Sequence, residues 1–189
     1  MNITENQSIP NPLNVPYLSQ LDNRLNPSGS CNVTCLAMVM KYWNILRNKR
    51  YQGFKQLEDE LYQYCLDNGL NRHSPTDLKK VLQNYGVHDT FTFSGSLIQC
   101  RNHINAGNPV IVHGYFTTFG HLVVLVGHDA SGFIVHDPYG EWFADGYQKN
   151  DKNNPERGKY QHYSNNLINR VCLPDGKLWA HFVENRKQC

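Results

Sequence analysis

The sequence holds six cysteines, and one of them, Cys31, stands where a catalytic nucleophile would stand. A thiol attacks a carbonyl carbon as the thiolate, and a helix N-terminus with a nearby imidazolium lowers its pKa from about 8.5 by several units. The turn at 27–30 precedes apolar residues at helical spacing, so Ser30 can cap a helix that has Cys31 in its first turn. The free N–H groups of that turn can also hold an oxyanion. The alternative for Cys31 is a buried cysteine on an apolar helix.

Cys35 follows one helical turn later, and i,i+4 spacing could place it on the same face as Cys31. It lacks the free N–H groups of the first turn, so we assign it to the core. The six cysteines show no paired metal-ligand spacing. A disulfide framework is not expected in a chain of 189 residues without a visible signal peptide.

A cysteine hydrolase also needs a base and a residue that orients the base. His121 opens the apolar run HLVVLVG, and Asp137 closes the next run, FIVHDP. If the runs form a hairpin with a five-residue loop at 128–132, His121 and Asp137 are diagonal neighbours on one face, about 7–8 Å apart. If the loop has four residues, Asp137 points to the opposite face. The sequence leaves both registers open. It also leaves open that His121 is only a hydrogen-bonded residue at a strand edge and that Asp137 only opens a turn.

The other eight histidines raise a metal site as an alternative. His113, His128 and His136 lie in or between the same apolar runs, and with His121 and Asp137 they could bind zinc. None of them shows a metal spacing such as HExxH, so we expect no metal and no other cofactor. The remaining five have no evident partner and are interpreted as surface or packing residues: His73, His88, His103, His162 and His181.

The segments that position these residues read as helices followed mostly by strands, which predicts an α+β domain. Helices are predicted over 31–46, 54–66, 75–86, 96–105 and 164–171. Strands are predicted over 87–93, in three antiparallel apolar runs at 109–116, 121–127 and 133–138, and over 178–183, with a long surface loop at 144–160. Residues 1–12 are interpreted as an extended lead-in, and 13–189 as a single domain.

Composition narrows the possible partners. Apolar residues make up 40% and charged residues 18%, as in a globular domain. A net charge of +2 is too small to indicate a nucleic acid as partner. We expect no membrane partner, because no apolar run approaches the roughly 18 residues of a spanning helix. The N-terminus lacks the basic and apolar regions of a secretory signal, so we expect a cytoplasmic protein or one exported without a cleaved signal, for example with a virion or during lysis.

The order of Gln20, Cys31, His121 and Asp137 resembles that of the papain-like peptidases of the bacteriocin-processing, double-glycine leader type, family thirty-nine of the cysteine peptidases, and their stand-alone relatives without a transporter. The resemblance spans most of 13–184 and rests on VPYLSQLDN, SCNVTCLAMVMKYW, GNPVIVHGYF, GHLVVLVGHD and FIVHDPYG. It implies a papain-like fold with N-terminal helices packed on a C-terminal antiparallel sheet. It also implies that Cys31 is the nucleophile, His121 the general base, Asp137 the residue that orients His121, and Gln20 the side-chain donor of the oxyanion hole.

Two departures from the family pattern are visible. Asn32-Val33 follows the cysteine where the family usually has Gly-Pro or a similar pair. Gln20, at the end of the segment 15–20, lies eleven residues before Cys31, so the loop 21–30 must fold back.

The resemblance implies a thiol hydrolase that cleaves amide bonds of a peptide or protein through a thioester. Two alternatives remain open. The substrate could be a cell-wall peptide cross-link, since Tyr115, Trp142 and Tyr147 near the expected cleft would suit a peptide or glycan surface. The scaffold could also be catalytically inactive and only bind or inhibit another protein.

Overall fold

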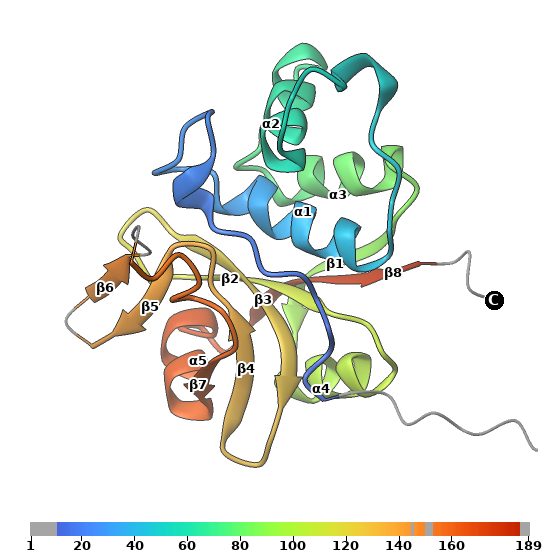
Figure 1. Ribbon diagram of the computed structural model, residues 1–189. Helices are drawn as coiled ribbons and strands as arrows, with labels where there is room; N and C mark the ends of the chain where they lie inside the picture. The colour runs from blue at the N-terminus through green and yellow to red at the C-terminus, as the bar shows by residue number, and fades with distance from the viewer. Residues whose placement is uncertain (1–10, 145, 150–152, 186–189) are drawn as a thin grey trace, which may run out of the picture.

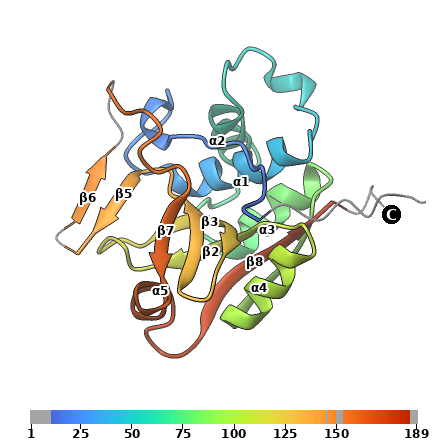
Figure 2. The same ribbon diagram turned by 60° about the horizontal axis from the view of Figure 1, so that its bottom comes forward.

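The computed structural model describes residues 11–144, 146–149 and 153–185. Helices cover both faces of a central sheet (Figure 1). On one face lie α1 (Cys31–Tyr42), α2 (Leu57–Asp67) and α3 (Pro75–Asn84), and on the other lie α4 (Leu97–Asn105) and α5 (Asn165–Cys172), which come forward in Figure 2. The first ten residues of the predicted lead-in at 1–12 lie outside the described residues.

The sheet has six strands in the order β1-β8-β2-β3-β4-β7, and each neighbouring pair is antiparallel. The bounds are β1 (His88–Gly95), β8 (Leu178–Glu184), β2 (Val110–Gly114), β3 (His121–His128), β4 (Gly132–His136) and β7 (Gln161–Ser164). The predicted α+β class and the three antiparallel apolar runs are therefore confirmed. The strand β7 was not predicted, because only four residues separate the preceding loop from α5.

Helix α1 forms the centre of the molecule. Every side chain from 32 to 40 is buried between the sheet and the other helices. The helix begins at Cys31 with Ser30 at the N-cap, as predicted, but the Ser30 hydroxyl does not cap it. That oxygen instead accepts a hydrogen bond from Asn23 Nδ2 at 2.8 Å, which ties the preceding loop to the helix start.

The starts of helices α3 and α2 can be compared with the predicted ones. Ser74 accepts from the N–H of Asp77 and places Pro75 at the first position of α3, as predicted. Helix α2 begins at Leu57 rather than Phe54. Before it, the Arg47 guanidinium donates to the carbonyl oxygens of Phe54 and Lys55, so these two groups are bonded outside the helix.

The β3–β4 hairpin settles the register that the sequence left open. Its first pairs, His128 with Phe133 and Gly127 with Ile134, follow the register in which the four residues 129–132 separate the paired positions. A bulge between Leu125 and Gly127 then shifts the register by one residue, so that Val124 lies opposite His136. This is the pairing expected for a five-residue loop, the register that places His121 and Asp137 on one face. The ends of the two strands therefore bring His121 and Asp137 to the same side.

The expected loop at 144–160 contains part of a two-stranded sheet, β5 (Gly140–Phe143) and β6 (Gly146–Lys149). This hairpin was missed because its residues are mostly polar and partly exposed, without an alternating apolar face. Gln20, at the end of the segment 15–20, begins a short 3-10 turn, η1 (Gln20–Asp22).

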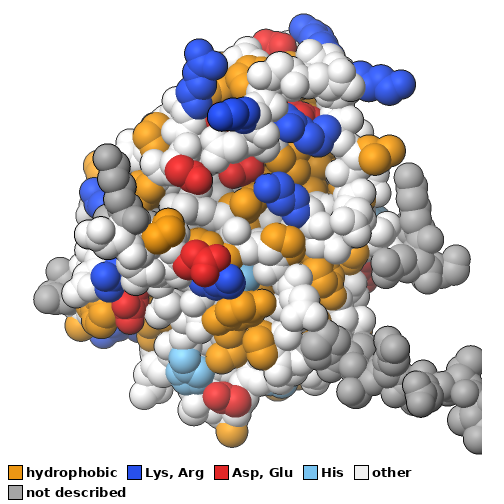
Figure 3. Space-filling view, viewed as in Figure 1, with side chains coloured by type: hydrophobic (Ala, Val, Ile, Leu, Met, Phe, Trp, Pro, Cys, Tyr) orange, Lys and Arg blue, Asp and Glu red, His pale blue; other side chains and the backbone are white. Residues whose placement is uncertain are grey.

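No helix within the described ranges has the length and apolar character that crossing a bilayer requires. On the face drawn in Figure 3, Lys and Arg side chains gather mainly over the helices at the top of the view.

Candidate active site

His121 and Asp137 form a buried hydrogen-bonded pair at the end of the hairpin. His121 Nε2 lies 2.8 Å from Asp137 Oδ1, and the two side chains are 4% and 0% exposed. Since Nε2 faces the carboxylate, Nδ1 is the ring nitrogen left for Cys31, with which the imidazole also has a hydrogen-bonding contact. The imidazole thus stands between a thiol and a carboxylate.

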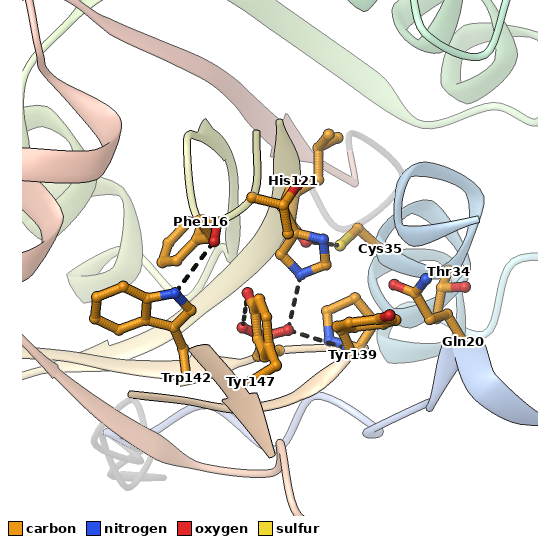
Figure 4. Close-up of polar contacts among 12 residues, drawn as sticks. Gln20, Thr34, Cys35, Phe116, His121, Tyr139, Trp142 and Tyr147 are labelled. Atoms are coloured by element: carbon orange, nitrogen blue, oxygen red, sulfur yellow. Dashed lines mark hydrogen bonds and ion pairs between the residues drawn. The ribbon is translucent and has the colours of Figure 1, made fainter. Parts of the chain in front are cut away.

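Asp137 receives three further donors, and two of them are tyrosine hydroxyls. Tyr147 Oη and Tyr163 Oη each donate to Asp137 Oδ2 at 2.8 Å, and the N–H of Tyr139 donates to Oδ1 at 3.0 Å. Burial and the Asp137 charge raise the pKa of both hydroxyls, so they remain protonated donors. In Figure 4 Tyr147 points toward the His121 ring, and the two rings meet edge to face with centroids 5.5 Å apart.

Sequence reasoning missed both roles. It placed Tyr147 in the cleft and assigned no site role to Tyr163. Tyr163 in β7 pairs with Phe133 in β4, and β4 leads directly into Asp137. This pairing could have placed Tyr163 near Asp137, but only if β7 had been recognised as a strand.

Cys31 lies at the first position of α1, in contact with His121. Burial by itself would raise the pKa of the Cys31 thiol. The charge of His121, a hydrogen bond from its ring and the N–H groups of Leu122 and Asn32 outweigh burial and lower the pKa below the usual thiol value. A helix N-terminus and an imidazole therefore act on this sulfur together.

The pKa of His121 moves in the opposite direction. Burial would lower it, but the Asp137 carboxylate and the Cys31 thiolate favour the charged ring and raise the pKa to about 10. Opposite shifts in two groups that touch favour a thiolate–imidazolium pair at neutral pH.

Cys35 lies in the core, as predicted. It is fully buried, and its Sγ donates to the carbonyl oxygen of Leu122 at 3.3 Å. Burial, with the nearby Cys31 and Asp137 charges, raises the pKa of Cys35 well above the usual value. This thiol is not prepared for nucleophilic attack.

Gln20 reaches the site from the side of α1 (Figure 4). Its side chain is 1% exposed, and one N–H of its Nε2 amide donates to Pro27 O at 2.9 Å, which leaves the second N–H for another acceptor. Its backbone N–H donates to Pro138 O at 2.8 Å, which joins it to the chain just after Asp137. The loop 21–30 folds back as expected and is held by the Asp59 carboxylate, which accepts from the N–H groups of Arg24 and Leu25.

A cavity of about 560 Å³ opens at this point, lined by Gln20, Cys31 and His121. On one side it is lined by Asn32 and Leu78 from helices and by Arg72 from the turn before α3. On the other side it is lined by His113, Tyr115 and Trp179. Tyr115 thus lies where the sequence predicted. Trp142 and Tyr147 do not line the cavity; Trp142 packs beside Phe116 and donates from Nε1 to Phe116 O at 3.2 Å.

The remaining histidines include one correction. His181 is not a surface or simple packing residue, because it is fully buried and bonded to Asp89 and His113. Across 11–144, 146–149 and 153–185, no three His, Cys, Asp or Glu side chains group closely enough to hold a metal ion.

Comparisons with known proteins agree with the fold. The sequence model of the Peptidase_C39 like family matches residues 12–168. A double glycine motif protease from an AMS/PCAT transporter, solved in complex with the leader peptide, superposes with a TM-score of 0.53 and 18% identity over 90% of this chain and 91% of that chain. A protein from Bacillus anthracis described as a C39-like peptidase gives 0.50 and 16% over 89% and 94%. No protein of curated function matches the sequence.

Proposed function

The chain belongs to the Peptidase_C39 like family, and from this premise we propose that it is a cysteine peptidase with Cys31 as nucleophile, His121 as general base and Asp137 as the group that orients His121. The observation that carries the proposal is one continuous series of contacts. Cys31 touches His121, His121 Nε2 lies 2.8 Å from Asp137 Oδ1, and Cys31 and His121 both line the cavity.

The reaction begins with transfer of the Cys31 proton to His121. The thiolate attacks an amide carbonyl carbon and forms a tetrahedral oxyanion. His121 then returns the proton to the leaving amine, which departs and leaves a thioester on Cys31. Water, activated by His121, hydrolyses the thioester and releases the acid.

The oxyanion is held by two donors in this proposal. The N–H of Cys31 belongs to the first turn of α1 and has no acceptor within the helix. The second N–H of the Gln20 amide is the other donor, since the first is fixed on Pro27 O. Loss of one such donor typically lowers the rate by about 100- to 1000-fold.

A peptide is the substrate that the comparisons favour. The double glycine motif protease of similar fold was solved with its leader peptide, so a peptide is known to occupy a protein of this architecture. A cavity of about 560 Å³ beside Cys31 has room for a few residues of an extended chain. A cell-wall peptide has no comparable support.

The experiment is a digest of a defined peptide library by the full chain, read by mass spectrometry. We expect cleavage by the native protein, none by Cys31→Ala, and retained cleavage by Cys35→Ala, the matched control one helical turn away. Cleavage by Cys31→Ala would refute the assignment of the nucleophile.

A parallel arm incubates the same proteins with purified cell walls. Release of cell-wall peptides without cleavage of the library would overturn the substrate class. If neither substrate is cut and a thiol-reactive probe fails to label Cys31, the chain is an inactive member of the family.

A further inference from the structure

A second hydrogen-bonded chain of ionisable side chains crosses the sheet away from Cys31. His181 Nδ1 lies 2.6 Å from Asp89 Oδ2, and His181 Nε2 lies 3.1 Å from His113 Nε2. The three residues come from β8, β1 and β2, which are neighbours in the sheet. The side chains of Asp89 and His181 are both 0% exposed. The proposed mechanism uses none of these residues.

This series of hydrogen bonds ends on the wall of the cavity that Cys31 lines. His113 lines the cavity, and it precedes Gly114, the residue paired with His121 across β2 and β3. Because His113 Nε2 is turned to His181, Nδ1 is the nitrogen left for a ligand in the cavity. A buried carboxylate therefore acts, through two imidazoles, on a polar atom at the cavity wall.

The hydrogen position on His113 is set by its contact with His181. The buried Asp89 carboxylate accepts from His181 Nδ1 at 2.6 Å, and the far nitrogen of the same ring meets His113. In the tautomer that we assign, His181 Nε2 donates to His113 Nε2, so His113 carries its hydrogen on Nδ1. Burial and the adjacent His181 charge lower the pKa of His113 to about 3, which keeps this ring neutral. The cavity wall thus presents a fixed N–H donor.

The surroundings favour an anionic ligand. The cavity lining contains Lys177 and Arg72 and one carboxylate, Asp175. Trp179 also lines the cavity, is 42% exposed, and meets the His113 ring edge to face with centroids 6.3 Å apart. Such a site offers an apolar surface for the carbon atoms of a ligand. It also offers an N–H donor and a cation for the anionic group at the end of that ligand.

From this arrangement we propose that His113, Lys177 and Trp179 form a subsite that binds an Asp or Glu side chain of the peptide substrate, with Asp89 and His181 as positioning residues behind His113. The proposal rests on the proposed function for the identity of its ligand as a peptide. It adds a preference for a carboxylate at one substrate position.

The test separates binding from catalysis. The full-length Cys31→Ala protein is incubated with three hexapeptide libraries that differ in one scanned position, fixed as Glu, Gln or Lys, and the retained peptides are measured by mass spectrometry. At one position we expect the Glu library to bind about tenfold more tightly than the Gln library, because a charged acceptor strengthens the hydrogen bond. The Lys library is expected to bind more weakly than both.

Variants assign this preference to the subsite. In the same background, His113→Phe should reduce the Glu-over-Gln ratio to within about twofold, whereas His113→Gln retains an N–H donor and should keep part of it. Lys177→Gln changes only an exposed residue and should lower the ratio by a few-fold even if His113→Phe does not fold. The matched control is His162→Phe, which removes another histidine paired with a carboxylate, Asp129, outside the cavity lining, and it should leave the ratio unchanged.

Equal binding of the Glu and Gln libraries at every position overturns the subsite, even if the native protein cleaves peptides. A Glu preference that survives both His113→Phe and Lys177→Gln also overturns it. A Glu preference lost in these variants, in a protein that cleaves nothing, supports the subsite and refutes only the proposed peptidase activity.

Discussion

The hydroxyl of Tyr147 lies 2.8 Å from Asp137 Oδ2, so the mostly polar β5–β6 hairpin supplies a hydrogen bond to the carboxylate that holds His121. Tyr163 donates to the same oxygen from β7. The two tyrosines occupy one carboxylate oxygen and leave the other for His121 and the N–H of Tyr139. Together they fix the plane of the carboxylate relative to the imidazole ring.

We therefore predict that Tyr147→Phe lowers kcat/KM for peptide hydrolysis on the order of tenfold, since a hydrogen bond to a charged group contributes about 1.5–3 kcal/mol. Tyr163→Phe should have a similar effect, and the double variant should lose more than either. Steady-state kinetics with a peptide from the library digest measure this. Tyr160→Phe, a change in a partly exposed tyrosine that packs on His136, is the control. Equal kcat/KM values for Tyr147→Phe and Tyr160→Phe would show that the Tyr147 hydroxyl does not support catalysis.

The backbone behind Asp137 has no room for a side chain at Gly158. A Cβ there would overlap the carbonyl oxygen of Asp137. The N–H of Asp137 also donates to Gly158 O at 2.9 Å, so the two backbone segments are bonded to each other. We predict that Gly158→Ala displaces Asp137 and lowers kcat/KM by at least about tenfold, because small displacements of catalytic groups are costly. Gly53→Ala is the matched control, since a Cβ there meets no described atom within 4 Å. A Gly158→Ala protein with native kinetics would show that the segment moves freely.

The opposite pKa shifts of Cys31 and His121 predict a bell-shaped dependence of kcat/KM on pH. Activity needs the thiolate, so it falls as pH drops through the lowered pKa of the pair, below the value of about 8.5 for a free thiol. It also needs the charged imidazole, so it falls again as pH rises through the pKa of His121, raised to about 10. Rates measured from acid to alkaline pH test both limbs. An acid limb at or above the pKa of a free thiol would contradict the shift at Cys31.

Much of this architecture was predictable because strong local signals agree with the tertiary structure. Ser74 with Pro75 fixed the start of α3, and the runs at 109–116 and 121–127 became adjacent antiparallel strands. Cys31 was placed at a helix start by the turn before it. These features depend on neighbours in sequence, so one chain suffices to see them.

Other features depend on partners that are distant in sequence. The bulge between Leu125 and Gly127 decides which face Asp137 occupies, and a glycine at the end of an apolar run does not by itself distinguish a bulge from a turn. The bond between Asp89 and His181 joins residues 92 positions apart, so His181 looked like an isolated histidine. The β5–β6 hairpin lacks an apolar face, and its position is fixed by contacts such as that of Tyr147 with Asp137. Burial and pairing across the sheet, not local propensity, determine these parts.

The central claim is that His121 activates the Cys31 thiol, and the pH dependence of iodoacetamide alkylation tests it most directly. Mass spectrometry follows the labelling rate of Cys31 in the native protein and in His121→Ala. We predict that Cys31 is labelled first in the native protein with a pKa below that of a free thiol. In His121→Ala the pKa should rise above that of a free thiol, because burial remains when the imidazole is gone. The same pKa in both proteins, or labelling of Cys35 before Cys31, would contradict the account.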